Sequence, residues 1–530
     1  MKTIKQRIYA VDIVIVIMLL LLAGLLLCLL LFPSDAVTGS IADKNGDGQV
    51  TLADYAGKKV GSISGVNLDL VVNKCIPGAT VEYYTNYPDM VVALNAGLID
   101  AFIIDGPALD AIMMEDPTVG KVPEPMSTWY MSFAFSDKSK IPGLRNQMND
   151  FIRMIRENGV LTEIRDIWFG ADDNVKIIPP LDELSAENGT VRVALETTYA
   201  PIAYIKDHQI VGYEIDILYR FCEYYHYGLE FMDMQFDAVL PAVVLGKCDI
   251  GASGLEYSEE HAEAVNMSEP HMEAETSLAV PITDLVGGDA VDNSVTLWEK
   301  VSGSVYKNLI QESRWQLIVQ GIVTTCLITV SAAAAGSILA FGICLLRRTK
   351  SYLANPLSNA YIHFFQGIPL AVLLMILFYV VFSGSNLESV WVAIIGFSLS
   401  FSAHAAEIMQ AGLDSIDHGQ EEAALALGYT GNQTFFRFLY PQAAVRFLPV
   451  YRGELVNLLN DTSIAGYIAV QDLTKMSDII RSRSYEAFLP LVLTTLIYFI
   501  LARVITLFIN ALLKAIFPKR MKSATGGDNS

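Results

Sequence analysis

Little in this sequence points to an enzyme. Only six cysteines and seven histidines occur in 530 residues, and they do not form a C-x-x-C pair or the spaced cluster of a zinc site. The nearest matches to a G-x-x-x-x-G-K-[ST] phosphate loop, Gly57-Lys58 and Gly246-Lys247, lack its upstream glycine and its Ser or Thr. A nucleophile elbow is missing too. These absences argue against catalysis and against ATP hydrolysis by this chain itself.

The few cysteines fall into two groups. Three lie in apolar runs, where a free thiol behaves as a small hydrophobic group, and three lie in a polar part of the chain. The first group is Cys28, Cys326 and Cys344, and the second is Cys75, Cys222 and Cys248. We expect unpaired structural thiols, with a Cys222–Cys248 disulfide as the alternative.

Positive charge is scarce and unevenly distributed. The formal net charge is −21, and residues 33–300 carry 43 acidic and 17 basic side chains, against 14 and 19 in the rest. An acidic block is therefore joined to a mildly basic, apolar block. The acidity argues against nucleic acid as a partner, because phosphate contacts need Lys and Arg.

Long apolar runs are what the chain has in abundance. Hydrophobic residues make up 52% of it and the mean hydropathy is +0.39, which predicts membrane spans. The uncharged run Ile13–Phe32 follows a basic tip and is interpreted as an uncleaved transmembrane anchor. Five further spans are expected, at residues 316–346, 358–382, 389–410, 447–470 and 488–516.

Basic residues orient these spans. Arg347 and Arg348 follow the first of the five, and Lys514, Lys519 and Arg520 follow the last. Because basic loops favour the cytoplasmic side, we expect both termini inside and residues 33–310 outside. The chain is thus predicted to be a multi-pass protein of the cell membrane, in contact with membrane lipid, with an extracellular acidic block.

The acidic block has the pattern of a soluble α/β unit. Short β-branched runs such as Val60–Ile63 and Val191–Ala194 alternate with helical stretches such as Tyr213–Tyr225. Polar stretches divide the chain further. We expect a basic tip and anchor at 1–35, α/β segments at 36–173 and 190–283 joined by a connector at 174–189, a linker at 284–314, a membrane domain at 315–517 and a cytoplasmic tail at 518–530.

A charged stretch, Leu413–Tyr440, separates the third and fourth spans of the membrane domain. It contains Gly419-Gln-Glu-Glu-Ala-Ala424, followed by Gly428 and then Pro441. Small residues followed by a glycine turn suit two short helices at a bend, a shape that can sit in a partner's groove. An ordinary amphipathic interfacial segment is the alternative.

This stretch resembles the EAA loop of ABC importer permeases, and Phe365–Leu370 and Asn460–Ile464 resemble motifs of the polar amino-acid permeases. The resemblance implies a separate ATPase subunit, which uses the ATP and docks on this loop, and a homodimeric permease, because one permease block is present. Gln366 and Gln410 stand where the family commonly has Arg, and Asn460 where it often has Lys. The implied coupling residues are Gly419, Glu422, Ala423, Ala424 and Gly428.

The acidic block resembles type II solute-binding proteins for amino acids, with the two halves in exchanged order. Residues 50–170 are similar to the second half of such a protein, and residues 190–281 to the first half. A circular permutation is favoured because the two pieces make one complete domain; two tandem domains that each lost a lobe are the alternative. The expected fold is multi-domain, with an α/β two-lobed solute-binding domain, an all-α membrane domain of five spans and an N-terminal anchor helix.

The resemblance also implies a ligand site between the lobes. It assigns two aromatic walls, a carboxylate for the ligand's ammonium group, a loop at a helix start whose N–H groups suit an anion, and a loop of the opposite lobe. In that order these are Tyr199 and Phe236, Asp105, Gly65 and Asn67, and Ser253 and Gly254.

One departure from the family changes the expected ligand. The family clamps the α-carboxylate with an Arg, and His261 occupies that position here. Glu196 and Glu256 also face the expected pocket, so with Asp105 it holds three acids and no permanent cation. A cationic solute is favoured; a domain that has lost delivery, with Glu256 and His261 in solvent, is the alternative.

A calcium loop is predicted independently of the family. Asp43, Asn45, Asp47, Thr51 and Asp54 fit positions 1, 3, 5, 9 and 12 of an EF-hand loop. A polar hinge loop with turn residues is the alternative.

The predicted function is therefore a permease subunit of an ATP-driven ABC importer for amino acids or a related small solute, without an intrinsic cofactor. A ligand-gated channel is disfavoured because the charged loop is cytoplasmic. A receptor or regulator that senses the solute without delivering it stays open.

Overall fold

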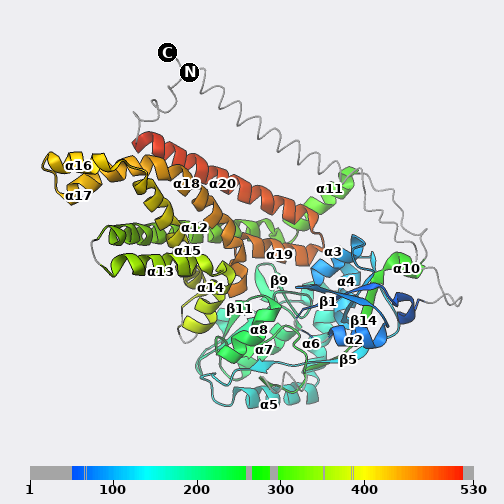
Figure 1. Cartoon of the computed structure of the whole chain (residues 1–530). Helices are drawn as coiled ribbons and strands as arrows, with labels where there is room; N and C mark the ends of the chain where they lie inside the picture. The colour runs from blue at the N-terminus through cyan, green and yellow to red at the C-terminus, as the bar shows by residue number, and fades with distance from the viewer. Residues whose placement is uncertain are drawn as a thin grey trace.

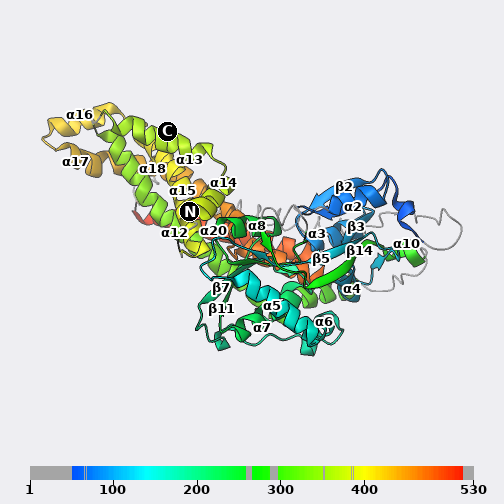
Figure 2. The same cartoon turned by 90° about the horizontal axis from the view of Figure 1, so that it is seen from below.

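The computed structural model describes residues 50–64, 66, 68–257, 265–286, 297–349, 352–382, 385 and 387–516. They form an α/β part and a helical part at the two ends of an elongated molecule (Figure 1, Figure 2). The expected anchor at Ile13–Phe32 and the expected tail at 518–530 lie outside the described residues.

The first sheet of the α/β part has the order β2-β1-β3-β14-β4, with β5 also paired to β14. Strands β2, β1 and β3 are parallel, and β3 is buried along its whole length, as is typical of parallel strands covered on both faces. The strands are β1 (Lys59–Ile63), β2 (Thr80–Tyr84), β3 (Ala101–Asp105), β4 (Val119–Lys121), β5 (Ser127–Met131) and β14 (Met272–Pro281), and the associated helices are α2 (Leu68–Cys75), α3 (Tyr87–Asn95), α4 (Gly106–Glu115) and α10 (Ile282–Val286).

The second sheet has the order β11-β7-β12-β6-β13, and a small third sheet has the order β10-β9-β8. The Trp168 indole donates to Asp216 at 2.9 Å and joins two of the flanking helices. The strands are β6 (Ala134–Phe135), β7 (Thr190–Leu195), β8 (Thr198–Tyr199), β9 (Ala203–Lys206), β10 (Gln209–Val211), β11 (Gly228–Asp233), β12 (Ile250–Gly251) and β13 (Asn266–Met267), and the helices are α5 (Leu144–Glu157), α6 (Val160–Phe169), α7 (Tyr213–Tyr224) and α8 (Phe236–Leu245).

The chain crosses between the two larger sheets twice. It leaves the first sheet after β5 and enters the second at β6, and it returns between β13 and β14. The segments 36–173 and 190–283 therefore each supply strands to both sheets. Two lobes connected by two short crossovers have the geometry of a hinge.

The helical part contains three helices that are long and apolar enough to cross a membrane, counted over the described residues. They are α12 (Trp315–Arg348), α15 (Ser389–Asp414) and α20 (Phe488–Ile516). The other elements are α11 (Leu297–Val305), η4 (Tyr306–Ile310), η5 (Gln311–Ser313), α13 (Ala354–Gly367), α14 (Leu370–Ile376), η6 (Leu377–Val381), α16 (His418–Ala426), α17 (Gly431–Thr434), η7 (Phe435–Leu439), α18 (Tyr440–Asp461), η8 (Thr462–Ile468) and α19 (Leu473–Ser484).

The predicted span at 358–382 is not one straight helix. The helices Ala354–Gly367 and Leu370–Val381 are bent by 102° relative to each other. If the pair is one broken span, it is a fourth candidate span. Pro369 lies at the break. A proline has no backbone N–H and disfavours helical backbone in the residue before it, so the helix ends there.

The structure also differs from the prediction at the expected span 447–470. Helix α18 begins earlier, at Tyr440, and the 3-10 helix η8 replaces its expected end. It is not among the candidate spans of the described residues, since Arg446, Arg452 and Glu454 interrupt its apolar face. The described chain thus has three or four candidate spans, where five were expected.

Helix α19 lies between the helical part and the α/β part (Figure 1). Its start is fixed by Asp472, whose carboxylate accepts from the backbone N–H groups of Thr474 and Lys475 at 3.0 and 3.1 Å. It also approaches α12 closely, because a Cβ on Gly321 would lie 2.7 Å from the Leu473 Cα. Any side chain at this position would push α19 away from α12.

Candidate functional site

The structure brings five of the predicted ligand residues to one small cavity between the lobes. The cavity has a volume of about 20 Å³, which is room for about one water molecule. The residues that line it are Ile63, Val66, Asn86, Tyr87, Trp129, Glu196, Tyr199, Phe236, Ser253 and Gly254. Protein side chains therefore occupy most of the space in which the ligand was expected.

Tyr199 joins the two lobes at this point. Its hydroxyl donates a hydrogen bond to Asp105 Oδ2, and its ring lies 4.8 Å from the ring of Tyr87. The second oxygen of Asp105 accepts from the Ala108 N–H at 2.9 Å and caps helix α4. Burial raises the pKa of Asp105, and the hydrogen bond from Tyr199 opposes that shift. The carboxylate expected to receive an ammonium group is thus engaged by a phenol of the opposite lobe.

The loop at Ser253 and Gly254 directs its backbone donors inward. Their N–H groups donate to Glu214 at 2.6 and 3.0 Å, and Glu214 Oε1 lies 3.1 Å from His271 Nε2. A Cβ on Gly254, whose φ is +69°, would lie 2.6 Å from the Tyr199 ring. Glycine is therefore required for Tyr199 to pack on the loop, and Glu214 of α7 holds the loop from behind.

The remaining predicted ligand residues are not at the cavity or cannot be placed. Glu256 forms an isolated antiparallel bridge with Met131, beside the β5–β6 crossover. Gly65, Asn67 and His261 lie outside the described residues, so their roles stay predictions.

A lysine of the helical part reaches the edge of this pocket. Lys475 Nζ on α19 lies 3.4 Å from Asp233 Oδ1, and only 6% and 2% of the two side chains are exposed. Burial opposes its charge, but Asp233 and Glu196 outweigh that effect and raise the pKa of Lys475. Burial also raises the pKa of Glu196 to about 7, and Lys475 limits the rise. No local sequence pattern indicates this contact, because its two sides are distant along the chain.

Two arginines of α19 extend the contact to both lobes. Arg481 lies 2.8 Å from Asp89, at the start of α3 in the first lobe. Arg483 lies 3.0 Å from Glu312 and its guanidinium lies 4.5 Å from the centre of the Tyr204 ring on β9. Helix α19 therefore holds the α/β part on the helical part through three buried or half-buried cations.

The predicted coupling loop lies at the far end of the molecule from the α/β part (Figure 1, Figure 2). It consists of helices α16 and α17, and Gly428 between them has a φ of +85°, a conformation that favours glycine. The Gly419 N–H donates to Asp417 at 2.7 Å, Glu422 and Ala423 are exposed and Ala424 is buried. Leu427 beside the turn is 78% exposed. The loop thus presents an apolar tip.

The predicted calcium loop is only partly described. Asp43, Asn45 and Asp47 lie outside the described residues. The backbone N–H and the hydroxyl of Thr51 donate to Asp54 at 2.9 and 3.0 Å, which closes a capping box at the start of the 3-10 helix η1 (Leu52–Tyr55). Asp54 therefore has a structural role of its own, and the calcium site stays a prediction.

The described cysteines are unpaired. Cys222 and Cys248 are both buried as free thiols, and burial raises the pKa of each to about 12. The alternative of a disulfide between them is wrong.

Comparison with known proteins places part of the chain in a described family. Residues 332–521 match the family "Binding-protein-dependent transport system inner membrane component". The probable amino-acid ABC transporter permease protein YckA of Bacillus subtilis is 33% identical over 198 residues, which cover 37% of this chain and 88% of that protein. The L-cystine transport system permease protein TcyB of Bacillus subtilis is 32% identical over 203 residues, with 38% and 86% covered. The arginine transport system permease protein ArtQ of the same organism is 30% identical over 191 residues, with 36% and 87% covered.

Solved structures also align with parts of the chain. An amino acid ABC transporter crystallised with histidines aligns with 42% of this chain and 99% of its own, at 26% identity and a TM-score of 0.36. A nutrient binding protein from Burkholderia cenocepacia bound to methionine aligns with 44% of this chain and 87% of its own, at 13% identity and a TM-score of 0.24. Scores this low do not by themselves establish a shared fold.

Replacement of Lys475 tests the contact between α19 and the α/β part. Lys475→Met leaves the Asp233 carboxylate buried without its cation, which should cost about 3–5 kcal/mol and appear as a lower Tm of the purified full chain. Lys121→Met is the control, because Lys121 pairs with Asp110 at 3.1 Å on an exposed surface, where a pair contributes about 0–1 kcal/mol. Equal effects of the two substitutions would show that Lys475 does not anchor the contact.

The raised pKa of Glu196 predicts a pH dependence. An acid whose folded pKa of about 7 exceeds its usual value of 4.5 favours the folded arrangement below pH 4.5, and this stability is lost as the pH rises through 7. At pH 8, Glu196→Gln should therefore raise the free energy of unfolding by up to about 3 kcal/mol, which appears as a higher Tm than that of the unchanged chain. At pH 5 the rise should be much smaller. Glu187→Gln is the control, because Glu187 is exposed, and it should change the Tm at neither pH. An effect of Glu196→Gln that does not depend on pH would contradict the raised pKa of Glu196.

Proposed function

The chain belongs to the binding-protein-dependent transport system inner membrane components, and we propose that it imports an amino acid or a related, cationic small solute through an ABC transporter. It is the membrane permease subunit, and ATP is hydrolysed by a separate subunit. The observation that carries the proposal is the position of α19, which links a two-lobed α/β part to a permease domain within one chain.

The permease part supports ATPase docking at the end of the molecule opposite to the α/β part. Helices α16 and α17 project there with an exposed apolar tip at Leu427, which suits a groove in a partner. Their implied docking residues include Glu422 and Gly428. We further propose a homodimer, because one permease block is present in the chain.

The topology of the proposal follows the charge distribution. The anchor at Ile13–Phe32 and five spans of the permease would place both termini in the cytoplasm and the α/β part outside. On this assignment, Arg348 and Glu421, which lie 3.0 Å apart beside the coupling loop, are cytoplasmic.

The α/β part is proposed to be a circularly permuted solute-binding domain. Support comes from the two crossovers, since the segments 36–173 and 190–283 share both larger sheets. Asp105, Glu196, Tyr199 and Phe236 would line its ligand pocket. An ammonium group of the solute would replace the Tyr199 hydroxyl on Asp105 when the lobes open.

A second candidate function is supported by the same contact. The pocket is filled by Tyr199 and Tyr87, with a cavity of only about 20 Å³, and α19 holds both lobes. A domain locked in this way would regulate the permease in response to a solute without delivering it. ATP-driven uptake by vesicles that contain the chain and its ATPase decides between the two, because a regulator would change the ATPase rate without solute accumulation.

Binding is tested at the Tyr199–Asp105 contact. Tyr199→Phe keeps the ring and removes the hydroxyl that competes for Asp105, so solute should bind about tenfold more tightly, as expected for one hydrogen bond to a charged group. Asp105→Ala should abolish binding. Calorimetry of the purified full chain with L-arginine, L-lysine, L-glutamine, L-glutamate and L-cystine measures both.

The control for this experiment is Tyr83→Phe. Tyr83 also donates to a carboxylate, Asp69, at 2.9 Å, but on an exposed surface, and its replacement should not change the dissociation constant. Weaker binding by Tyr199→Phe would mean that the hydroxyl contacts the solute and does not compete with it.

Coupling to the ATPase is tested at Gly428. Gly428→Asp forces a side chain into the left-handed conformation at φ +85°, at a cost of about 1–2 kcal/mol, and distorts the turn between α16 and α17. Solute-stimulated ATP hydrolysis and uptake should fall at least tenfold, while the amount of folded chain in the membrane stays the same. Gly303→Asp, at another glycine with open space around it, should leave both rates unchanged; normal uptake by Gly428→Asp would refute the assignment.

A further inference from the structure

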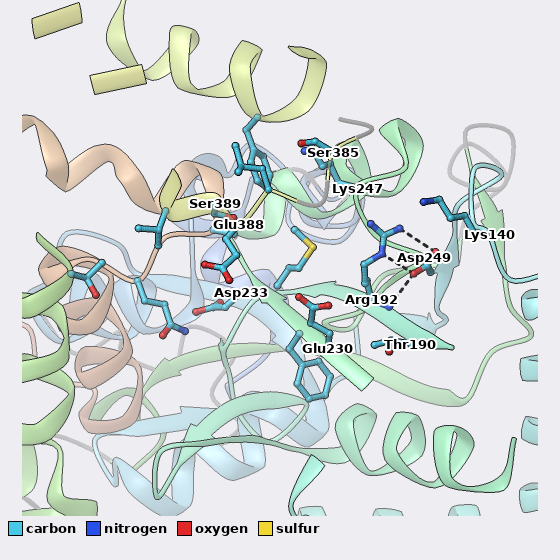
Figure 3. Close-up of a pocket in the computed structure, with 18 of the residues that line it drawn as sticks. Lys140, Thr190, Arg192, Glu230, Asp233, Lys247, Asp249, Ser385, Glu388 and Ser389 are labelled. Carbon is cyan, nitrogen blue, oxygen red and sulfur yellow. Dashed lines mark hydrogen bonds and ion pairs between the residues drawn. The ribbon is translucent and has the colours of Figure 1, made fainter. Parts of the chain in front are cut away.

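A large cavity lies between the second lobe of the α/β part and the helical part. Its volume is about 730 Å³, within the range of cavities that hold small molecules, and Figure 3 shows the side chains around it. We refer to it as the chamber. The lobe contributes residues of β7, β11 and the turn after α8, and the helical part contributes residues of α12, of the segment before α15 and of the segment after η8.

Carboxylates gather on one side of the chamber. Glu230 and Asp233 come from β11 and Glu388 from the start of α15, and all three line the chamber. In the view of Figure 3 the carboxylates of Asp233 and Glu388 lie near one another, and Glu230 lies between them and Arg192. The side chain of Asp233 is only 2% exposed. Its Oδ1 accepts from the Thr197 N–H at 3.1 Å and pairs with Lys475, whereas its Oδ2 has no hydrogen-bond partner among the described residues.

An unbonded buried carboxylate oxygen is unusual and costly. Most buried polar atoms in folded proteins have a partner, and one that lacks a partner bears the whole cost of its desolvation. Since Asp233 also lines the chamber, an ammonium group located there could donate to this oxygen. The geometry therefore indicates a cationic group on this side.

Cations lie on the other side of the chamber. Lys247, which is 4% exposed, donates one hydrogen bond to the Phe382 carbonyl and lies 4.6 Å from the centre of the Phe378 ring. An ammonium has three donors, so two remain for other acceptors. Arg192 is already engaged by Asp249 at 3.1 Å, which leaves Lys247 as the buried cation most able to receive a carboxylate.

We propose that the chamber is a transfer site, which holds a zwitterionic amino acid between the binding pocket and the permease. The ammonium group would face Asp233, Glu230 and Glu388, and the carboxylate would face Lys247. The proposal rests on the import function proposed above and adds a second position for the same solute.

The shared carboxylate gives the transfer a route. Asp233 pairs with Lys475 at the edge of the pocket that contains Glu196, and the same residue lines the chamber. A solute ammonium that leaves the pocket would stay near the same carboxylate during the move. The transfer therefore does not require an unpaired ammonium group to cross a dry interface.

The test removes the exposed acids of the chamber and leaves the pocket unchanged. Glu230→Gln with Glu388→Gln keeps the side-chain size and removes two negative charges. The double variant and the unchanged chain are compared in vesicles with the ATPase, and the probe is whichever amino acid of the five named above binds the unchanged chain most tightly. The matched control is Glu187→Gln with Glu223→Gln, two exposed acids that do not line the chamber.

For the double variant we expect a dissociation constant within twofold of that of the unchanged chain. Its Vmax/KM for uptake should fall at least tenfold, since a charge-assisted contact commonly contributes that much. The control should change neither quantity. Unchanged uptake by the chamber variant would overturn the transfer site, and so would an equal fall in binding and uptake, which would place the acids at the pocket. An unchanged chain that takes up none of the five would instead overturn the import function itself, and the transfer site with it.

Discussion

The burial of Lys475 between Asp233 and Glu196 constrains how the two parts of this protein can move. A charged pair can exist inside a protein only while its partners stay together, because each charge alone would lose its hydration without compensation. Lys475 belongs to the permease and both acids belong to the α/β part. The joint can therefore be closed and dry, with the charges paired, or open and wet, with each charge hydrated. Intermediate separations are disfavoured, which gives the contact the two-state character that switching requires.

The interior of the α/β part follows from the same arrangement. With α19 held against Asp89 and Asp233, the lobes lie close enough for Tyr199 to reach Asp105 and for its ring to pack on Gly254. The contacts that close the pocket and the contacts that attach the domain to the permease therefore act together. A solute that separates Tyr199 from Asp105 changes the arrangement of the lobes that α19 contacts. Helix α19 alone could therefore transmit the effect of the solute to the permease.

Some of this organisation could be predicted from the sequence, because it depends on local patterns. The helix–turn–helix of the coupling loop follows from small residues around Gly428, and the resemblance to ABC importer permeases is confirmed. The break at Pro369 also had a local signal, since Gly367 and Pro369 flank it, but the apolar character of residues 358–382 favoured one straight span. The charges of Arg452 and Glu454 likewise argued against a regular span in α18, and the apolar residues around them outweighed that signal.

The contacts of the candidate site could not be predicted in the same way. Motif comparison assigned Tyr199 and Asp105 to a ligand, and no local pattern indicates that they bond to each other. Lys475 and Asp233 meet only because α19 packs beside the residue that ends β11, a result of tertiary packing. Glu214 lies in the segment 190–281, which resembles half of a solute-binding protein, yet its role behind the Ser253–Gly254 loop depends on the side-chain geometry.

The attachment of the α/β part to the permease within one polypeptide has a kinetic consequence. A binding protein that diffuses freely meets its permease in a second-order step, whose rate depends on how much of each protein the cell makes. Here the encounter is intramolecular, and a short connection sets an effective concentration in the millimolar range. Each permease then always has its own binding domain, in a fixed ratio, and a separate binding protein would compete poorly for the same docking surface.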